Sequence, residues 1–190
     1  MTMLLSEREK MLAGELYLST DPELQAEMAE AQQRLRRLNA IPNEDSDQRF
    51  ESLYGLLGRI GTGTQIKSVF MCDYGAHIRI GRNGFVNYGC IFLDCNFITI
   101  GDDAQIGPGV HIYTAIHPTN PETRRSGLEA ARQVTIGDNV WLGGACVICP
   151  GVVIGSNAVV GAGSVVVRSV PSNCVAVGNP CRVIREIRQW

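Results

Sequence analysis

The histidines of this chain are the side chains best suited to acid–base chemistry, because an imidazole titrates near neutral pH. There are three, His77, His111 and His117. A histidine held beside a hydroxyl group can take its proton and make the oxygen a nucleophile. His77 and His111 each precede an isoleucine, whereas His117 precedes Pro118 within a polar stretch. This pattern predicts that His77 and His111 point outward as surface residues and leaves His117 open to a catalytic role.

The seven cysteines do not form a convincing reactive pattern. Cys146 and Cys149 have the spacing of redox or zinc motifs, but no second pair accompanies them. Cys146 also occupies a small-residue position of the repeat described next. We therefore expect reduced, packed thiols and no acyl-enzyme nucleophile, and Ser126 is expected to be a turn residue.

A six-residue repeat organises most of the chain. Aliphatic residues recur at positions 136, 142, 148, 154, 160 and 166, and glycine follows at 137, 143, 155 and 161. Neither a helix nor a strand has this period, so it predicts a solenoid in which each hexapeptide forms one flat face. The same phase starts upstream at 60, 80 and 100, and an interval of twenty residues fits three faces per turn.

The repeat stops between Tyr113 and Gln133 and resumes at Ile136. Residues 113–133 must therefore leave the core as a long loop, and a loop on a rigid scaffold often carries function. We expect a β-helix domain over residues 59–190 that contains this loop. Its tail, 171–190, is predicted to form a tight turn followed by a basic, apolar strand or helix.

Residues 1–58 are predicted to form a helical segment that caps one open end of the solenoid. Ser6 with Glu9 can form a capping box for a short helix. Asp21 and Pro22 can open a longer helix to about Leu38. A third helical pattern leads into the first coil.

Composition favours one globular unit over other classes of protein. The chain has 190 residues, of which 45% are hydrophobic, so it can bury one good core. A formal net charge of −2 and few aromatic residues argue against nucleic acid as a partner. No apolar run reaches transmembrane length and the N-terminus is charged early, so we expect no membrane association and a cytoplasmic location.

Five stretches of the sequence resemble the maltose and galactoside O-acetyltransferases, a family of hexapeptide-repeat enzymes. They are MLAGELY (11–17), CDYGAHIRIGRN (72–83), GVHIYTAIHP (109–118), IGDNVWLGGACVICPGVVIG (136–155) and GNPCRVIREI (178–187). The resemblance covers nearly the whole chain in matching order and spacing. It implies a mainly β fold, a left-handed parallel β-helix, with acetyl-CoA as co-substrate and no metal. It also implies a homotrimer with active sites between adjacent subunits.

The resemblance implies two catalytic residues. His117 aligns with the family histidine that acts as general base. Asn87 matches a family asparagine that binds the acceptor and helps to stabilise the transition state. An amide can donate a hydrogen bond to developing negative charge without becoming charged itself. The implied reaction is direct transfer of an acetyl group from acetyl-CoA to a hydroxyl of a sugar such as maltose, glucose or a galactoside.

Acceptor and cofactor contacts follow from the same resemblance. Asp73 matches an acceptor-contacting position, and Asp94 lies near another, although the acid of the galactoside enzymes aligns with Cys95. The N-terminal family contact would fall on Asp21, for which a helix cap is an equal explanation. The Gly144 amide is the candidate oxyanion donor. The full cofactor-binding set is Gly144, Ala162, Val167, Arg168, Arg182 and Arg185.

Two other functions fit the same solenoid. A zinc-dependent carbonic anhydrase could use His77, His111 and His117 from adjacent subunits as metal ligands. A non-catalytic sugar-binding or scaffold protein is the second alternative, because a fold alone does not fix a function.

Overall fold

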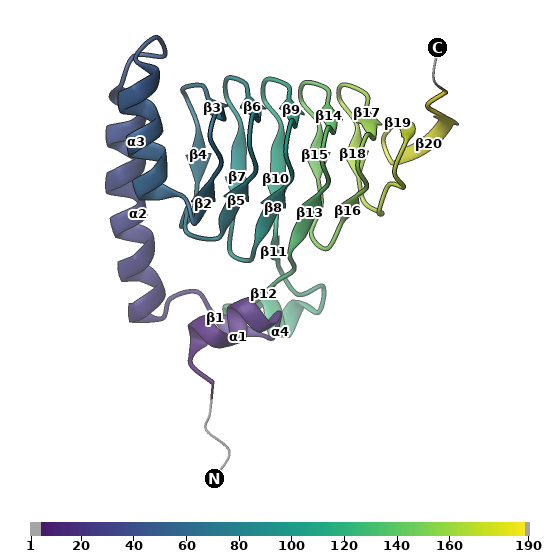
Figure 1. Ribbon diagram of the computed structural model, residues 1–190. Helices are drawn as coiled ribbons and strands as arrows, with labels where there is room; N and C mark the ends of the chain where they lie inside the picture. The colour runs from purple at the N-terminus through teal and green to yellow at the C-terminus, as the bar shows by residue number, and fades with distance from the viewer. Residues whose placement is uncertain (1–4, 189–190) are drawn as a thin grey trace.

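The computed structural model describes residues 5–188, and three parallel sheets wrap into a solenoid (Figure 1). The first sheet contains β2 (Arg59–Ile60), β5 (Ile78–Ile80), β8 (Ile98–Ile100), β13 (Val134–Ile136) and β16 (Val153–Ile154). The second contains β3 (Gln65–Ile66), β6 (Phe85–Val86), β9 (Gln105–Ile106), β14 (Trp141–Leu142), β17 (Val159–Val160), β19 (Cys174–Gly178) and β20 (Cys181–Glu186). The third contains β4 (Met71–Cys72), β7 (Ile91–Leu93), β10 (His111–Tyr113), β15 (Val147–Ile148) and β18 (Val165–Val166). Each coil visits the sheets in this order.

The repeat positions fill the core as predicted. Leu142, Ile148 and Val160 are fully buried, and so is Cys146 at its small-residue position. Burying one such aliphatic side chain contributes roughly 1.5–3 kcal/mol. The corner glycines allow neighbouring coils to approach: a Cβ at Gly143 would lie 2.5 Å from a backbone nitrogen of the next coil. The hexapeptide solenoid with three faces is therefore confirmed.

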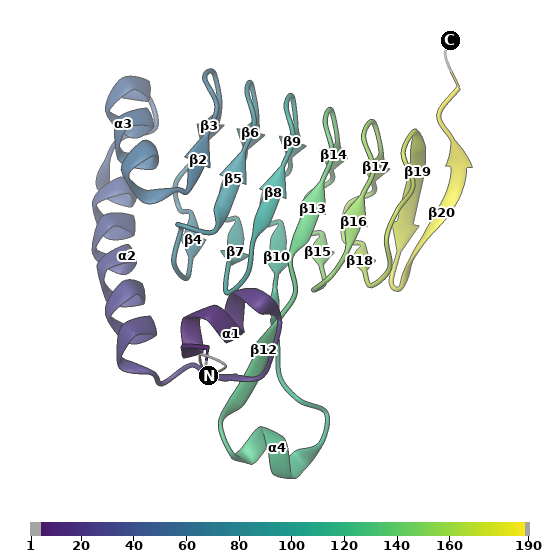
Figure 2. The ribbon, with the colours of Figure 1, turned by 60° about the horizontal axis from the view of Figure 1, so that its bottom comes forward.

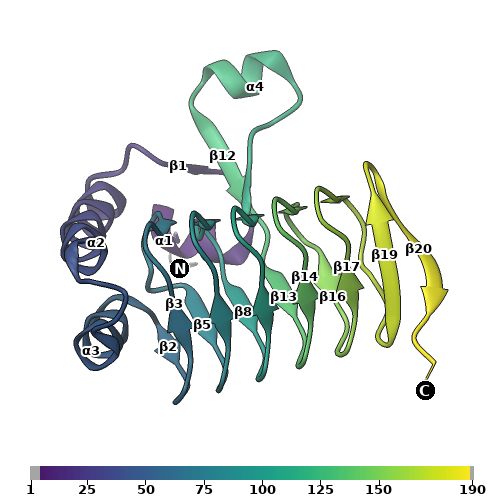
Figure 3. The ribbon, with the colours of Figure 1, turned by 90° about the horizontal axis from the view of Figure 1, so that it is seen from above.

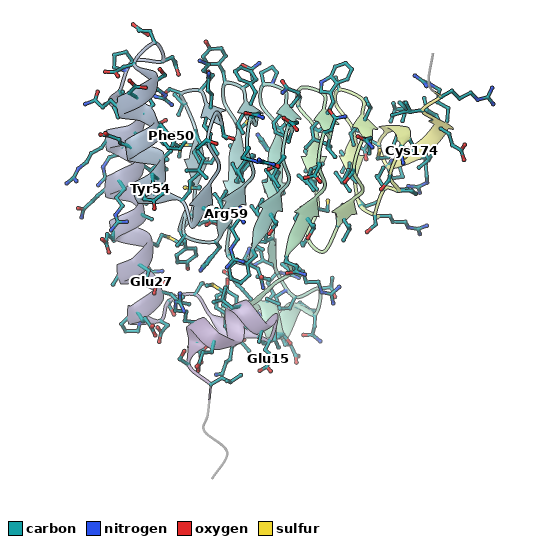
Figure 4. All side chains as sticks on the ribbon, viewed as in Figure 1. Glu15, Glu27, Phe50, Tyr54, Arg59 and Cys174 are labelled. Atoms are coloured by element: carbon teal, nitrogen blue, oxygen red, sulfur yellow. The ribbon has the colours of Figure 1, made fainter. Side chains whose placement is uncertain are left out.

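Two helices, α2 (Pro22–Ala40) and α3 (Ser46–Leu56), cover the first coil, with Phe50 and Tyr54 at one end of the solenoid and Cys174 at the other (Figure 4). The short helix α1 (Glu7–Ala13) instead packs beside α2 and the excursion, where Met11 is buried with Tyr17 and Ala131. The capping box of Ser6 and Glu9 and the Asp21 cap are both present. Figure 3 shows α2 and α3 beside β2 and β3. Leu35, Leu38 and Leu53 join the core of the first coil.

The excursion at 113–133 has regular structure of its own. It consists of β11 (Ala115–Ile116), α4 (Pro121–Arg125) and β12 (Leu128–Ala131). Strand β12 pairs antiparallel with β11 and also with β1 (Tyr17–Leu18), so the N-terminal segment is part of this small sheet. Figure 2 shows α1 and α4 at the two ends of β12. Ser126 ends α4, as expected of a turn residue.

The C-terminal tail forms a strand, so the helical alternative for it is wrong. Strand β20 folds back antiparallel on β19, because the turn at 178–181 reverses the chain. Val175 and Ala176 extend the second sheet by pairing with Val159 and Val160. Arg182 and Arg185 therefore lie on an edge strand beyond the last coil.

Candidate active site

His117 follows β11 directly, where the excursion leaves the solenoid. Its side chain is 64% exposed, and Nδ1 lies 3.9 Å from Oε1 of Glu129. The pairing of β11 with β12 places the two residues together, since Ile116 pairs with Ala130 one step before them. The Nε2 atom is then the ring nitrogen left to accept a proton.

Glu129 is a candidate site residue that the sequence did not reveal. Its Oε2 accepts a hydrogen bond from the Tyr17 hydroxyl at 3.3 Å, and its Oε1 accepts one from Ser19 Oγ at 3.1 Å. The only feature of the sequence that indicates Glu129 is its position in the polar segment after His117. The contacts to residues far away in sequence come from the pairing of β1 with β12.

Asp73 and Cys95 lie on the same side of the solenoid as Glu129. Asp73 follows β4, and its Oδ2 accepts a weak hydrogen bond from the Cys95 thiol at 3.6 Å. Burial raises the pKa of the Asp73 carboxyl, and nearby Glu129 adds to the rise. Burial also raises the pKa of Cys95 to about 12, so its thiol stays protonated and is a donor. Asp73 is half-buried, which leaves a carboxylate that a ligand hydroxyl could reach.

Asp94 and His77 do not occupy the positions expected of them. Asp94 is fully buried, and its carboxylate accepts hydrogen bonds from the backbone amides of Asp73, Tyr74 and His77. Asp94 therefore stabilises the turn that carries Asp73. Because its side chain is buried, it is not positioned to contact an acceptor directly. Burial raises its pKa to about 7, although the three amides favour the carboxylate.

The prediction that His77 is a surface residue is wrong, because the residue is only 2% exposed. The turn after Asp73 folds the ring inward, where it lies beside Tyr74 and Phe97. Its Nδ1 lies 2.7 Å from the backbone oxygen of Asp94, and burial lowers its pKa. His111 is half-buried on the outer face of the third sheet, with Nδ1 2.5 Å from the Tyr113 hydroxyl.

Asn87 and Gly144 lie on another edge of the solenoid. We call the edge where the strands of the third sheet begin the start edge. We call the edge where these strands end, at Asp73, Asp94 and Thr114, the loop edge. Asn87 Oδ1 accepts a hydrogen bond from the Tyr88 amide at 2.8 Å. Within residues 5–188, no hydrogen bond occupies its Nδ2 group or the amide of Gly144. Both can therefore donate to a ligand, and the exposed Ala162 lies one coil further along this edge.

The two edges are too far apart to form one reaction centre within one chain. Asn87 and Asp94 are separated by the whole of β7, and a hexapeptide of extended chain spans roughly 20 Å. His117 belongs to the loop edge and Asn87 to the start edge. The structure therefore brings His117, Glu129 and Asp73 to the same side and leaves Asn87 and Gly144 on another.

The remaining predicted cofactor residues lie toward the C-terminal end. Val167 and Arg168 follow β18 on the loop edge and are exposed. An open cavity of about 1050 Å³ lies on the second sheet between β20 and the strands β14 and β17, lined by Trp141, Val159 and Arg185 among others. Within residues 5–188, the Arg182 and Arg185 guanidinium groups donate hydrogen bonds only to the backbone oxygens of Cys181 and Glu186, and neither forms a salt bridge. Both cations are therefore available to phosphate groups.

The carboxylate of Asp21 is used by the cap of α2, where it accepts hydrogen bonds from the amides of Glu23 and Leu24. Its contact with an acceptor stays a prediction. In the described part of the chain, no three His, Cys, Asp or Glu side chains come together as a metal site. None of the helices there has the length and apolar character needed to cross a membrane.

Two family models match this chain. Residues 133–168 match the bacterial transferase hexapeptide (six repeats), and residues 10–61 match the maltose acetyltransferase hexapeptide capping motif. The capping-motif match runs from within α1 through α2 and α3 to β2, and the hexapeptide match covers β13 to β18 beyond the excursion. Together with the solenoid and its two polar edges, they define the class: the protein is a hexapeptide-repeat acetyltransferase.

Similar proteins narrow this class. A maltose O-acetyltransferase from Clostridium difficile 630 is 45% identical, with a TM-score of 0.96 over 97% of this chain and 99% of that one. The chain belongs to the maltose and galactoside O-acetyltransferase family, and its fold is the left-handed parallel β-helix. Nodulation protein L of Rhizobium meliloti is 48% identical over 94% of this chain and 97% of its own length.

Two further structures contain the cofactor. A galactoside acetyltransferase in complex with coenzyme A is 34% identical, with a TM-score of 0.94 over 97% of this chain and 92% of that one. A hexapeptide-repeat acetyltransferase from Vibrio cholerae, complexed with acetyl coenzyme A, is 35% identical, with a TM-score of 0.90 over 97% of this chain and all of that one. Acetyl-CoA is therefore the co-substrate of this class of enzyme.

Proposed function

We propose that this acetyltransferase moves an acetyl group from acetyl-CoA to a hydroxyl of a sugar such as maltose, glucose or a galactoside. The observation that carries the proposal is the set of polar groups on the loop edge, where His117, Glu129 and Asp73 converge. A sugar presents several hydroxyls, and carboxylates accept hydrogen bonds from them. The similar maltose and galactoside enzymes support the same class of acceptor.

His117 is the general base of this proposal. Its Nδ1 faces Glu129, so Nε2 takes the proton of the acceptor hydroxyl as the oxygen attacks the thioester carbonyl. The bond from the carbonyl carbon to sulfur then breaks, and the imidazolium returns the proton to the leaving thiolate. The transfer is direct, since no residue of the site serves as an acyl-enzyme nucleophile in it.

The developing oxyanion is stabilised by donors on the start edge. The Asn87 amide Nδ2 and the Gly144 backbone N–H are both unoccupied within residues 5–188, so they can donate to it without first breaking a bond. Arg182 and Arg185 bind phosphates of acetyl-CoA, and Ala162, Val167 and Arg168 contact its extended arm. These roles require His117 and Asn87 to lie close together. Within one chain they lie on different edges of the solenoid.

A second and third copy of the chain complete the site in this proposal. The outer face of the third sheet carries four apolar side chains, Met71, Ile91, Val147 and Val165, in one row of register neighbours with His111. The first sheet instead presents Arg59 and Arg79 outward. Packing the apolar faces together around a threefold axis removes them from water and joins the loop edge of one chain to the start edge of the next.

Release of free coenzyme A thiol tests the proposal. Native protein is assayed with acetyl-CoA against maltose, glucose, galactosides and amino sugars, beside His117→Ala and Asn87→Ala. His117→Ala is expected to lower kcat by roughly two to four orders of magnitude while coenzyme A binding persists. An active His117→Ala variant would remove His117 as the base. Coenzyme A binding without release for any sugar would instead reject the acceptor class.

A further inference from the structure

Two hydroxyl groups of the N-terminal segment converge on the carboxylate of Glu129. Tyr17 OH donates to Oε2 at 3.3 Å and Ser19 Oγ donates to Oε1 at 3.1 Å. Oε1 is also the atom that lies 3.9 Å from His117 Nδ1. Each carboxylate oxygen of Glu129 thus has a donor from a segment more than a hundred residues earlier in the chain.

We propose that Tyr17 and Ser19 are positioning residues, which hold the Glu129 carboxylate in the orientation that directs His117 for proton transfer. The inference rests on the proposed role of His117 as the base. A carboxylate on a rotatable side chain has several orientations, and two fixed donors select one of them. Loss of a donor lets Glu129 turn away, and His117 then loses the contact that orients its ring.

The position of Tyr17 makes its hydroxyl a rigid donor. Tyr17 is directly opposite Glu129 in the pairing of β1 with β12, so the two side chains share a face of the small sheet. The residue is fully buried. A buried hydroxyl must find a hydrogen-bond partner within the protein, and Glu129 is that partner.

These hydroxyls are not needed to attach the N-terminal segment, which has other anchors. The Glu7 carboxylate accepts a hydrogen bond from the Leu18 amide at 2.7 Å. Asn96 Nδ2 donates to the backbone oxygens of Met11 and Leu12 at the end of α1. Because β1 also pairs with β12 through its backbone, removing one hydroxyl should leave the fold in place. A functional role can then be separated from a structural one.

The variants Tyr17→Phe and Ser19→Ala each remove one donor and keep the packing. Each is expected to lower kcat about tenfold, the factor that corresponds to loss of one hydrogen bond to a charged group. The KM for acetyl-CoA should not change, because both hydroxyls contact Glu129 and not a residue proposed to bind the cofactor. Ser19→Thr restores a hydroxyl and should recover most of the activity. Tyr54→Phe and Thr20→Ala are matched controls on exposed residues and should leave kcat unchanged.

Combination with Glu129→Ala tests whether the hydroxyls act through Glu129. In that background, Tyr17→Phe and Ser19→Ala should cause no further loss of kcat. Full additive losses, or unchanged kcat in both single variants, would overturn the proposal. Thermal unfolding of every variant identifies a loss that comes from instability, and a melting temperature that falls in step with kcat would also overturn it. If instead His117→Ala remains active, it is the base assignment that fails.

Discussion

The Nδ1 atom of His117 lies 3.9 Å from Oε1 of Glu129, across the pair of strands that the excursion forms. This separation is longer than a hydrogen bond, and such contacts often shorten when a substrate binds. Sequence periodicity could not identify Glu129, because β12 belongs to the excursion and lies outside the six-residue repeat. Glu129 can either orient the His117 imidazole or contact the acceptor itself, and kinetic measurements can distinguish these two roles.

If Glu129 orients His117, Glu129→Gln should lower kcat by about tenfold to a hundredfold. The same substitution should have no further effect in a His117→Ala background, because the residue it orients is absent. The measurement is a double-mutant cycle on steady-state kcat, with the exposed acid Glu51→Gln as control. A loss that persists without His117 would show that Glu129 contacts the acceptor itself.

Hybrids of the proposed trimer test whether the two edges of different chains share one site. His117→Ala and Asn87→Ala subunits are each expected to be nearly inactive alone. After unfolding and refolding a 1:1 mixture, about one quarter of the interfaces would pair an intact His117 with an intact Asn87. Activity should therefore return to about a quarter of the native value. A mixture as inactive as its parents would place both residues in the same chain's site.

Arg182 should affect the cofactor and not the acceptor. Arg182→Glu reverses a charge whose only hydrogen bond within residues 5–188 is to the backbone oxygen of Cys181. We expect the KM for acetyl-CoA to rise about tenfold, while the acceptor KM stays within about twofold. Arg59→Glu is the matched control, since Arg59 lies in β2 of the first sheet and Arg182 lies in β20 of the second. Equal effects of the two reversals would mean that only the overall charge matters.

The solenoid could be predicted because its signal is periodic. Ile136, Leu142 and Ile148 repeat a local requirement, an aliphatic facing inward, and each coil meets it in the same way. The turn after Asp73 breaks this rule. There the backbone amides bind the Asp94 carboxylate, which buries His77 as well, and no six-residue period encodes that contact.

The candidate site could be predicted only in part. The break in the repeat located His117, and the family resemblance added Asn87 and Arg182. Glu129 and its donors Tyr17 and Ser19 were not predictable from spacing, because an antiparallel pairing between β1 and the excursion brings them together. The separation of the two edges likewise follows from the arrangement of complete coils.

The buried Asp94 carboxyl should make stability depend on pH. Its pKa in the folded protein is raised to about 7, so between pH 4 and 7 the folded state binds the proton more tightly than the unfolded state. The resulting stabilisation is present at low pH and is lost as pH rises through 7. Asp94→Asn removes this titration. The free energy of unfolding of the native protein, minus that of the variant, should therefore decrease from pH 5 to pH 8. Urea unfolding at each pH measures it, with the exposed Asp47→Asn as control. An advantage that grows with pH would mean that the three backbone amides, and not burial, dominate the pKa of Asp94.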